Sequence, residues 1–161
     1  MGFDLYGSND TDKEVDWDNP IPGQYFRANV WSWRPLWNLT STIGEDILTE
    51  NDIRMGQFND GHEISEEKSV ALADLFRTMI RKGEHHTIVA ERDAYLNTMP
   101  LQKCEHCSGT GERDDEHVQG KCNGCGGRGE TESLKTWYRL EVLLIEEFEN
   151  FLRHSGGFCI H

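Results

Sequence analysis

The chain has 161 residues, of which 36% are hydrophobic and 10% aromatic, a length typical of one domain that carries at most one small module. Its 29 Asp and Glu residues exceed its 16 Lys and Arg residues and give a formal net charge of −13. This charge argues against nucleic acid and anionic membranes as partners, because both bind proteins through cationic side chains.

The N-terminus, MGFDLYGSND, lacks the basic and apolar regions of a signal peptide. No apolar run reaches the roughly 18 residues that span a bilayer. We therefore expect a soluble cytoplasmic protein without a membrane partner, in a reducing compartment that disfavours disulfides.

The first predicted segment is an irregular acidic arm at residues 1–24. Turn-forming residues and acids are frequent there, and Pro20 and Pro22 prevent a helix. Across residues 1–65, twelve acids outnumber four bases. This excess would suit a basic protein partner, although it would also serve solubility alone.

Residues 25–100 are predicted to form a helical core. Between Phe26 and Ile43, apolar residues recur at helical spacing, and Pro35 divides them into two short helical pieces. A second helix is predicted over 65–82, with Ser65 as its N-cap and an apolar face ending before Gly83. A further helical segment is expected over 84–98.

The C-terminal part, residues 131–161, is predicted to return to the core as a strand followed by a helix. Apolar residues from Leu144 to Leu152 have helical spacing, and Gly156 and Gly157 are expected to end that helix. With a zinc-binding β-hairpin module inserted at 101–130, the predicted fold class is α+β and mostly helical.

Two related octets, CEHCSGTG and CNGCGGRG, occupy the predicted module and give the pattern C-x2-C-x14-C-x2-C. This spacing is typical of two turns that close on one tetrahedral metal ion. Four thiolates in a reducing cell favour one structural Zn²⁺, which leaves no open coordination position for catalysis. The predicted ligands are Cys104, Cys107, Cys122 and Cys125.

Two alternatives remain open for this segment. His106 or His117 could replace a cysteine as a ligand. Cys104-Glu-His-Cys107 also has a His before its second Cys, as disulfide-exchange enzymes do. Such enzymes usually place the first thiol at a helix N-terminus, and the glycines that follow Cys107 are poor helix formers.

The octets resemble the CxxCxGxG zinc module of DnaJ-class co-chaperones, in which each zinc ion is bound by two repeats. This chain has two repeats, at residues 104–129, so the resemblance implies one zinc ion. There is no His-Pro-Asp motif, and hence no indication of a J domain.

Further stretches resemble a family of small bacterial and phage-encoded proteins. They are MGFDLYG, GQYFRANVWSWRPLW, FNDG, ALADLF and FLRHSGGF. This resemblance implies a bacterial or phage origin and no particular activity.

A cluster of Trp and Arg residues follows the N-terminal arm. It could line a pocket that stacks a nucleotide-like ligand, or it could be the core face of a helix, since aromatic residues at helical spacing usually pack inside. The residues are Arg27, Trp31, Trp33, Arg34 and Trp37.

The leading functional hypothesis is a non-enzymatic, zinc-stabilised binding protein. It would be an accessory or counter-defence factor that engages a host or bacterial protein through an acidic surface, in a bacterial cell or a phage-infected host. The alternatives are a binder of a nucleotide-like ligand and an enzyme with a site around Asp60 and His62. Cys159 is expected to be a free thiol.

Overall fold

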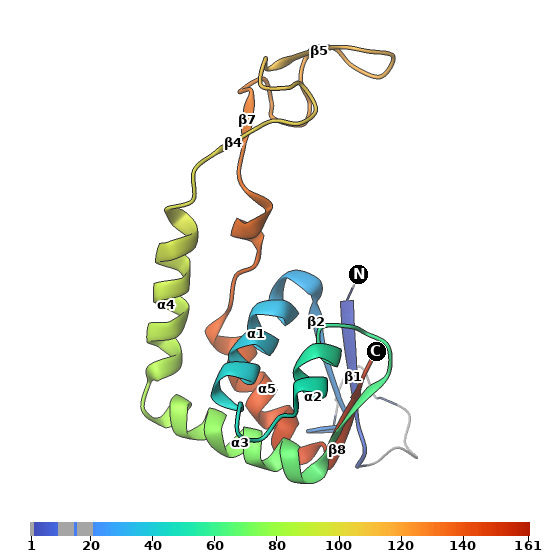
Figure 1. Cartoon of the computed structure of the whole chain (residues 1–161), viewed down its shortest axis with the longest axis vertical. Helices are drawn as coiled ribbons and strands as arrows, with labels where there is room; N and C mark the ends of the chain where they lie inside the picture. The colour runs from blue at the N-terminus through green and yellow to red at the C-terminus, as the bar shows by residue number, and fades with distance from the viewer. Residues whose placement is uncertain (1, 10–14, 16–20) are drawn as a thin grey trace. The chain divides into compact units, whose positions relative to one another are not determined.

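The computed structural model describes residues 2–9, 15 and 21–161. Much of the predicted acidic arm, including its acids between residues 10 and 18, lies outside the described residues. The chain divides into unit 1, Met1–Arg92 with Tyr138–His161, and unit 2, Asp93–Trp137. The fold is α+β, as predicted (Figure 1).

Unit 1 contains a four-stranded antiparallel sheet in the order β2-β1-β8-β3. The strands are β1 (Gly2–Gly7), β2 (Tyr25–Asn29), β3 (His62–Ser65) and β8 (Gly157–Ile160). The register pairs Leu5 with both Phe26 and Ile160, so the two ends of the chain lie side by side in the centre of the sheet. Alternate side chains of these strands are buried on one face.

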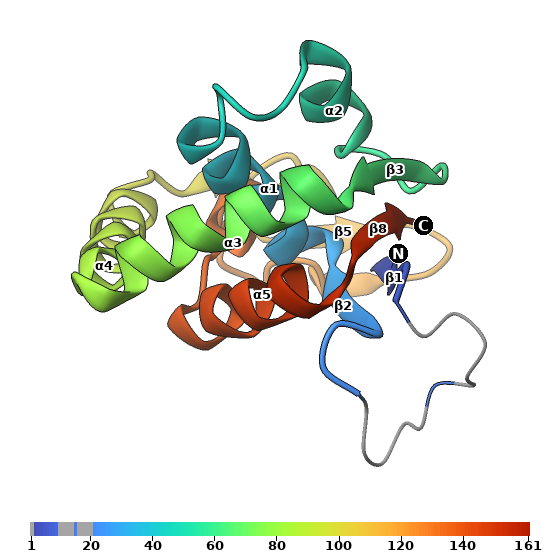
Figure 2. The same cartoon turned by 90° about the horizontal axis from the view of Figure 1, so that it is seen from below.

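The helices are α1 (Val30–Ile43), α2 (Glu50–Met55), α3 (Glu66–Arg81), α4 (Glu84–Asn97) and α5 (Val142–His154). Helices α3 and α5 pack against each other and lie side by side in Figure 2. The predictions of helices over 65–82, over 84–98 and up to Ser155 are confirmed. Ser65 is the N-cap of α3 and accepts a hydrogen bond from Lys68 N–H.

One apolar core joins the buried sheet face to α1, α3 and α5. Its largest fully buried side chains include Trp33, Trp37, Phe76, Phe148 and Phe158. The Trp33 ring stacks on Phe3 at 5.4 Å and on Trp37 at 5.3 Å between centroids. Aromatic rings dominate this core because each buries a large apolar area.

The structure differs from the sequence-based predictions of secondary structure in four places. Residues 2–7 of the predicted irregular arm form β1, and the predicted helical core contains strands β2 and β3. Pro35 does not divide α1, which runs from Val30 to Ile43 with Pro35 buried inside it. The residues after Gly156 were expected only to follow the end of α5, but they form strand β8.

The continuity of α1 has a physical cause. Pro35 removes one backbone donor and disfavours a helix interior, but the surrounding residues Trp33, Leu36 and Trp37 are fully buried on the core side of the helix. Asn29 caps the first turn by accepting hydrogen bonds from the N–H groups of Trp31 and Ser32. Packing and capping together outweigh the local cost of the proline.

A buried carboxylate, that of Asp52, links α2 to β3 and α3. Its Oδ1 lies 2.9 Å from His62 Nε2, and its Oδ2 accepts hydrogen bonds from Lys68 Nζ and from the Thr49 backbone and hydroxyl. Burial raises the pKa of Asp52, but the hydrogen bonds from Lys68, Thr49 and His62 outweigh burial and hold this pKa well below its usual range.

We predict that Asp52→Asn destabilises the protein by about 3 kcal/mol at pH 7, because Lys68 would lose its buried counter-charge. Since the folded-state pKa of Asp52 is lowered, its ionisation stabilises the fold fully above the unfolded pKa of about 4, and this contribution is lost progressively as pH falls from that value through the lower folded-state pKa. Urea unfolding of both proteins between pH 7 and pH 3 should show the difference shrinking below about pH 4. A difference that stays constant over this range would contradict the assignment.

Among the described residues, no helix is long and apolar enough to cross a membrane.

Candidate metal centre

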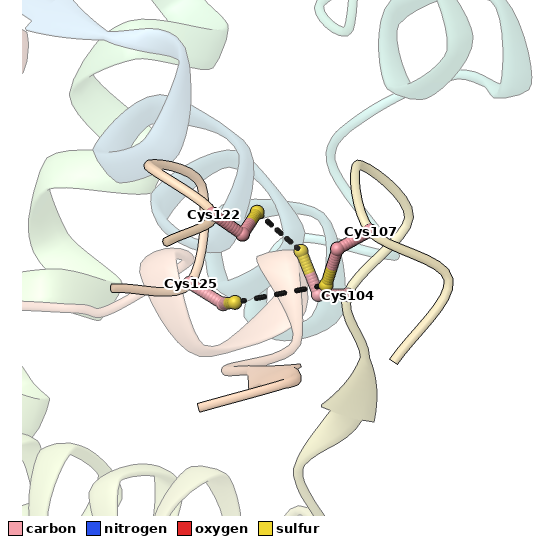
Figure 3. A group of neighbouring side chains, drawn as sticks. All are labelled: Cys104, Cys107, Cys122 and Cys125. Atoms are coloured by element: carbon pink, nitrogen blue, oxygen red, sulfur yellow. Dashed lines mark hydrogen bonds between the residues drawn. The ribbon is translucent and has the colours of Figure 1, made fainter. Parts of the chain in front are cut away.

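Two short antiparallel ribbons in unit 2 position the four cysteines of the octets. One ribbon pairs β4 (Gln102–Lys103) with β7 (Glu130–Thr131). The other, which lies between β4 and β7 in the sequence, pairs β5 (Glu112–Asp114) with β6 (Gln119–Lys121). Cys104 directly follows β4, and Cys122 directly follows β6. The two turns therefore face each other and direct their four side chains inward (Figure 3).

The four thiols are buried, free and mutually close. The four Sγ atoms all lie within 4.8 Å of one another. Cys104 Sγ lies 3.9 Å from Cys122 Sγ, and Cys107 Sγ lies 3.8 Å from Cys125 Sγ. A tetrahedral Zn²⁺ with Zn–S bonds of about 2.3 Å requires sulfurs about 3.8 Å apart. The donor type and the spacing both fit a zinc ion.

The two octets adopt nearly the same backbone conformation and are cross-linked by matching hydrogen bonds. Cys104 N–H donates to Gly129 O, and Cys122 N–H donates to Gly111 O, both at 2.9 Å. Gly111 N–H donates to Cys107 Sγ, and Gly129 N–H donates to Cys125 Sγ, both at 3.2 Å. Each octet thus supplies a donor to its own second thiol and an acceptor to the other octet.

These backbone donors favour thiolates. Burial raises the pKa of Cys107, but the N–H groups of Gly111 and Gly109 outweigh burial and lower this pKa to about 6. For Cys125, burial again raises the pKa, and the Gly129 N–H contributes to a net lowering. Burial raises the pKa of Cys104. Cys107 and Cys125 are therefore more readily ionised than an ordinary thiol, as a metal ligand must be.

Glycines make the close approach of the octets possible. Gly111 and Gly129 both have φ of +78°, and a Cβ on either would lie 2.5 Å from a carbonyl oxygen of the opposite octet, on Gly127 or Gly109. A larger residue would be strained in conformation and would also push the two turns apart.

We predict that Gly111→Ala weakens zinc binding and lowers the thermal unfolding midpoint of unit 2. Gly126→Ala is the matched control, because Gly126 also has positive φ, +59°, but has open space around its Cβ position. The free energy of unfolding of Gly126→Ala should fall only by the backbone cost of a left-handed alanine, roughly 1–2 kcal/mol. Competition with a colorimetric zinc chelator measures the affinity, and equal affinities for the two variants would disprove the steric argument.

The histidines considered as alternative ligands lie outside the thiol cluster. The His106 ring covers the backbone of Gly124, where a Cβ would meet His106 Cδ2 at 2.4 Å. His117 is exposed, with Nε2 3.1 Å from the Glu116 carboxylate. Neither belongs to the group of residues that could hold a metal ion.

The Trp and Arg cluster does not converge on one cavity. Trp33 and Trp37 are fully buried, and their indole N–H groups donate to the carbonyls of Gly56 and Ile53. Trp31 packs edge-on against Tyr138, and Arg27 and Arg34 are exposed. The faces of Trp33 and Trp37 therefore belong to the core and are closed to a flat ligand.

His62, which the sequence analysis paired with Asp60, forms a hydrogen bond with Asp52 in the structure. This association was not predicted, although the spacing Thr49-x-x-Asp52 is a capping-box pattern that places Asp52 at the start of a helix. Cys159 is a free, half-buried thiol in β8, and burial and the charge of Glu63 raise its pKa. Neither arrangement supplies an activated nucleophile beside a base.

Comparison of the chain with protein-family models, with curated proteins and with solved structures finds no match. Four converging thiols form a closed shell, which suits a structural metal ion rather than one that activates substrate.

Proposed function

We propose that this chain is a non-enzymatic, zinc-stabilised binding protein. The observation that carries the proposal is the group of four buried thiols within 4.8 Å of one another. Cys104, Cys107, Cys122 and Cys125 would hold one Zn²⁺, in the manner of half of a DnaJ-type module. The ion would supply the cross-link that keeps the two octets together.

Unit 2 depends on such a cross-link because it lacks an apolar core. Its buried cluster consists of the four cysteines, Leu96 is buried outside that cluster, and the large apolar side chains Tyr95, Leu101, Leu134 and Trp137 are exposed. Small modules without a core are commonly folded by a metal ion. Zinc would therefore act by holding the exposed surface of unit 2 in one conformation.

The partner we propose is a protein with a basic surface. The net charge of −13 favours the approach of cations and disfavours nucleic acid and anionic lipid. In this proposal the chain acts in the cytoplasm of a bacterial cell or a phage-infected host, as an accessory or counter-defence factor that binds a host or bacterial protein.

Metal analysis tests the proposed centre. Protein purified under reducing conditions should contain one zinc per chain by plasma mass spectrometry, and Cys104→Ser/Cys125→Ser should contain none. Cys159→Ser, which removes the thiol outside the cluster, should retain the metal. Absence of metal in the wild-type protein, or iron in place of zinc, would overturn the proposal.

A further inference from the structure

A surface cleft lies beside the candidate metal centre, within unit 2. Its volume is about 590 Å³, and its walls include Cys104 and Glu105 of the first octet, Gly124 and Arg128 of the second, and Glu132 and Trp137 from the segment after β7. Residues from three separate segments thus form one concave surface, and the octets set its shape.

The cleft exposes large apolar groups. The Trp137 side chain is 53% exposed and Leu134 is 60% exposed, and both line the cleft. An exposed tryptophan in a concave surface is typical of a binding site, since Trp is enriched among the residues that dominate binding free energy. An indole face also attracts ammonium and guanidinium groups.

The charges around the cleft favour a cationic ligand. Two cations, Lys103 and Arg128, and two carboxylates, Glu105 and Glu132, line the cleft. Arg128 Nε donates to Cys125 O, and the methylene carbons of Lys103 lie over Gly109, so the side chains of both cations pack on the octets. Within the described part of the chain, no ion pair or side-chain hydrogen bond engages Glu105 or Glu132. A Zn²⁺ ion with four thiolates would add a net charge of −2 beside them.

We propose that this cleft binds an extended, arginine- or lysine-bearing segment of a protein partner. A cationic side chain of that segment lies over the Trp137 indole and between Glu105 and Glu132, while apolar side chains of the segment contact Leu134. This inference rests on the proposed function, because the metal centre holds the octets in place, and it locates the binding surface that the proposal leaves unplaced.

A fluorescently labelled eight-residue peptide of alternating Arg and Leu is the probe. Fluorescence anisotropy with zinc-loaded protein should show saturable binding that weakens as salt rises. The same peptide with citrulline in place of Arg keeps the shape without the charge and should bind at least about tenfold more weakly. Equal binding of the citrulline peptide would overturn the proposal in favour of a purely apolar groove.

Matched variants place the binding in the cleft. Trp137→Ala and Glu105→Gln/Glu132→Gln should each weaken binding about tenfold. Glu45→Gln/Glu91→Gln makes the same change in net charge at exposed positions in unit 1 and should change affinity by less than about twofold. If both double variants weaken binding equally, the peptide responds to overall charge and the cleft is not its site.

Metal content separates this inference from the proposal on which it rests. Zinc-loaded protein that fails to bind the peptide would disprove the cleft assignment and leave the zinc centre intact. Protein that contains no zinc and still binds through Trp137 would disprove the metal centre and retain the cleft. Retained zinc in each cleft variant shows that the loss of binding is not due to unfolding of unit 2.

Discussion

Cys122→Ser should abolish zinc binding and unfold unit 2 while unit 1 remains folded. Hydrogen exchange followed by mass spectrometry should show loss of protection across residues 101–131 and unchanged protection in α3 and α5. Zinc content should fall from one per chain to none. Treatment of the wild-type protein with a strong chelator should reproduce the same exchange pattern.

The expected size of this effect follows from the composition of unit 2. In zinc-finger peptides, the metal contributes roughly 10–16 kcal/mol of apparent binding free energy at pH 7. Unit 2 has no apolar cluster to compensate for its loss, because its buried cluster is the four thiols alone. Its ribbons, β4 with β7 and β5 with β6, are only two to three residues long on each strand, too short to be stable without support.

Cys159→Ser is the matched control, since it makes the same chemical change at a thiol in β8 of unit 1. It should keep both the metal and the protection of residues 101–131. Persistent protection of these residues in Cys122→Ser would show that the octets fold without metal and would contradict the structural role of zinc.

The features that sequence reasoning located are those encoded by local spacing. Helix α3 has its cap at Ser65 and an apolar face that includes Leu72 and Phe76, all within one short segment. The cysteines are likewise arranged by spacings within each octet. Such patterns can be read without knowledge of the rest of the chain, because the residues that interact are close in sequence.

The sheet was not predicted because its pairings are distant in sequence. Leu5 pairs with Ile160, and His62 also pairs with Ile160, so both neighbours of β8 are distant from it in the chain. Strands β3 and β8 have only four residues each. In so short a segment, the alternation of apolar and polar residues that marks a strand cannot be distinguished from the sequence of a loop. A local pattern contains no information about such partners.

The cleft beside the metal centre was missed for a related reason. Leu134 and Trp137 resemble isolated apolar residues in a polar segment, and only the fold of unit 2 brings them to the same cleft as Glu105. For Trp33 and Trp37, the sequence left two interpretations open, the core face of a helix and a ligand pocket with Arg27 and Arg34. Burial, which the sequence does not state directly, separates an exposed Trp from a core Trp.

Trp33→Ala should destabilise unit 1 by about 3–5 kcal/mol, the usual cost of deleting a large buried aromatic side chain. Trp33 is fully buried, stacks on Phe3 and Trp37, and donates its indole N–H to Gly56 O at 2.8 Å. The substitution leaves a cavity and also leaves the Gly56 carbonyl without this donor. Urea unfolding followed by far-ultraviolet circular dichroism should show a lower midpoint.

Trp31→Ala is the control for Trp33→Ala, because Trp31 is only partly buried and lies at the same end of α1. Trp31→Ala should lower the free energy of unfolding by less than Trp33→Ala does. Zinc content should be unchanged in both variants, since the thiols belong to unit 2. If Trp33 lined a ligand pocket, its replacement would instead leave stability nearly unchanged and abolish a thermal shift caused by nucleotides. The burial of Trp33 therefore predicts a large loss of stability and no nucleotide-dependent shift in the wild-type protein.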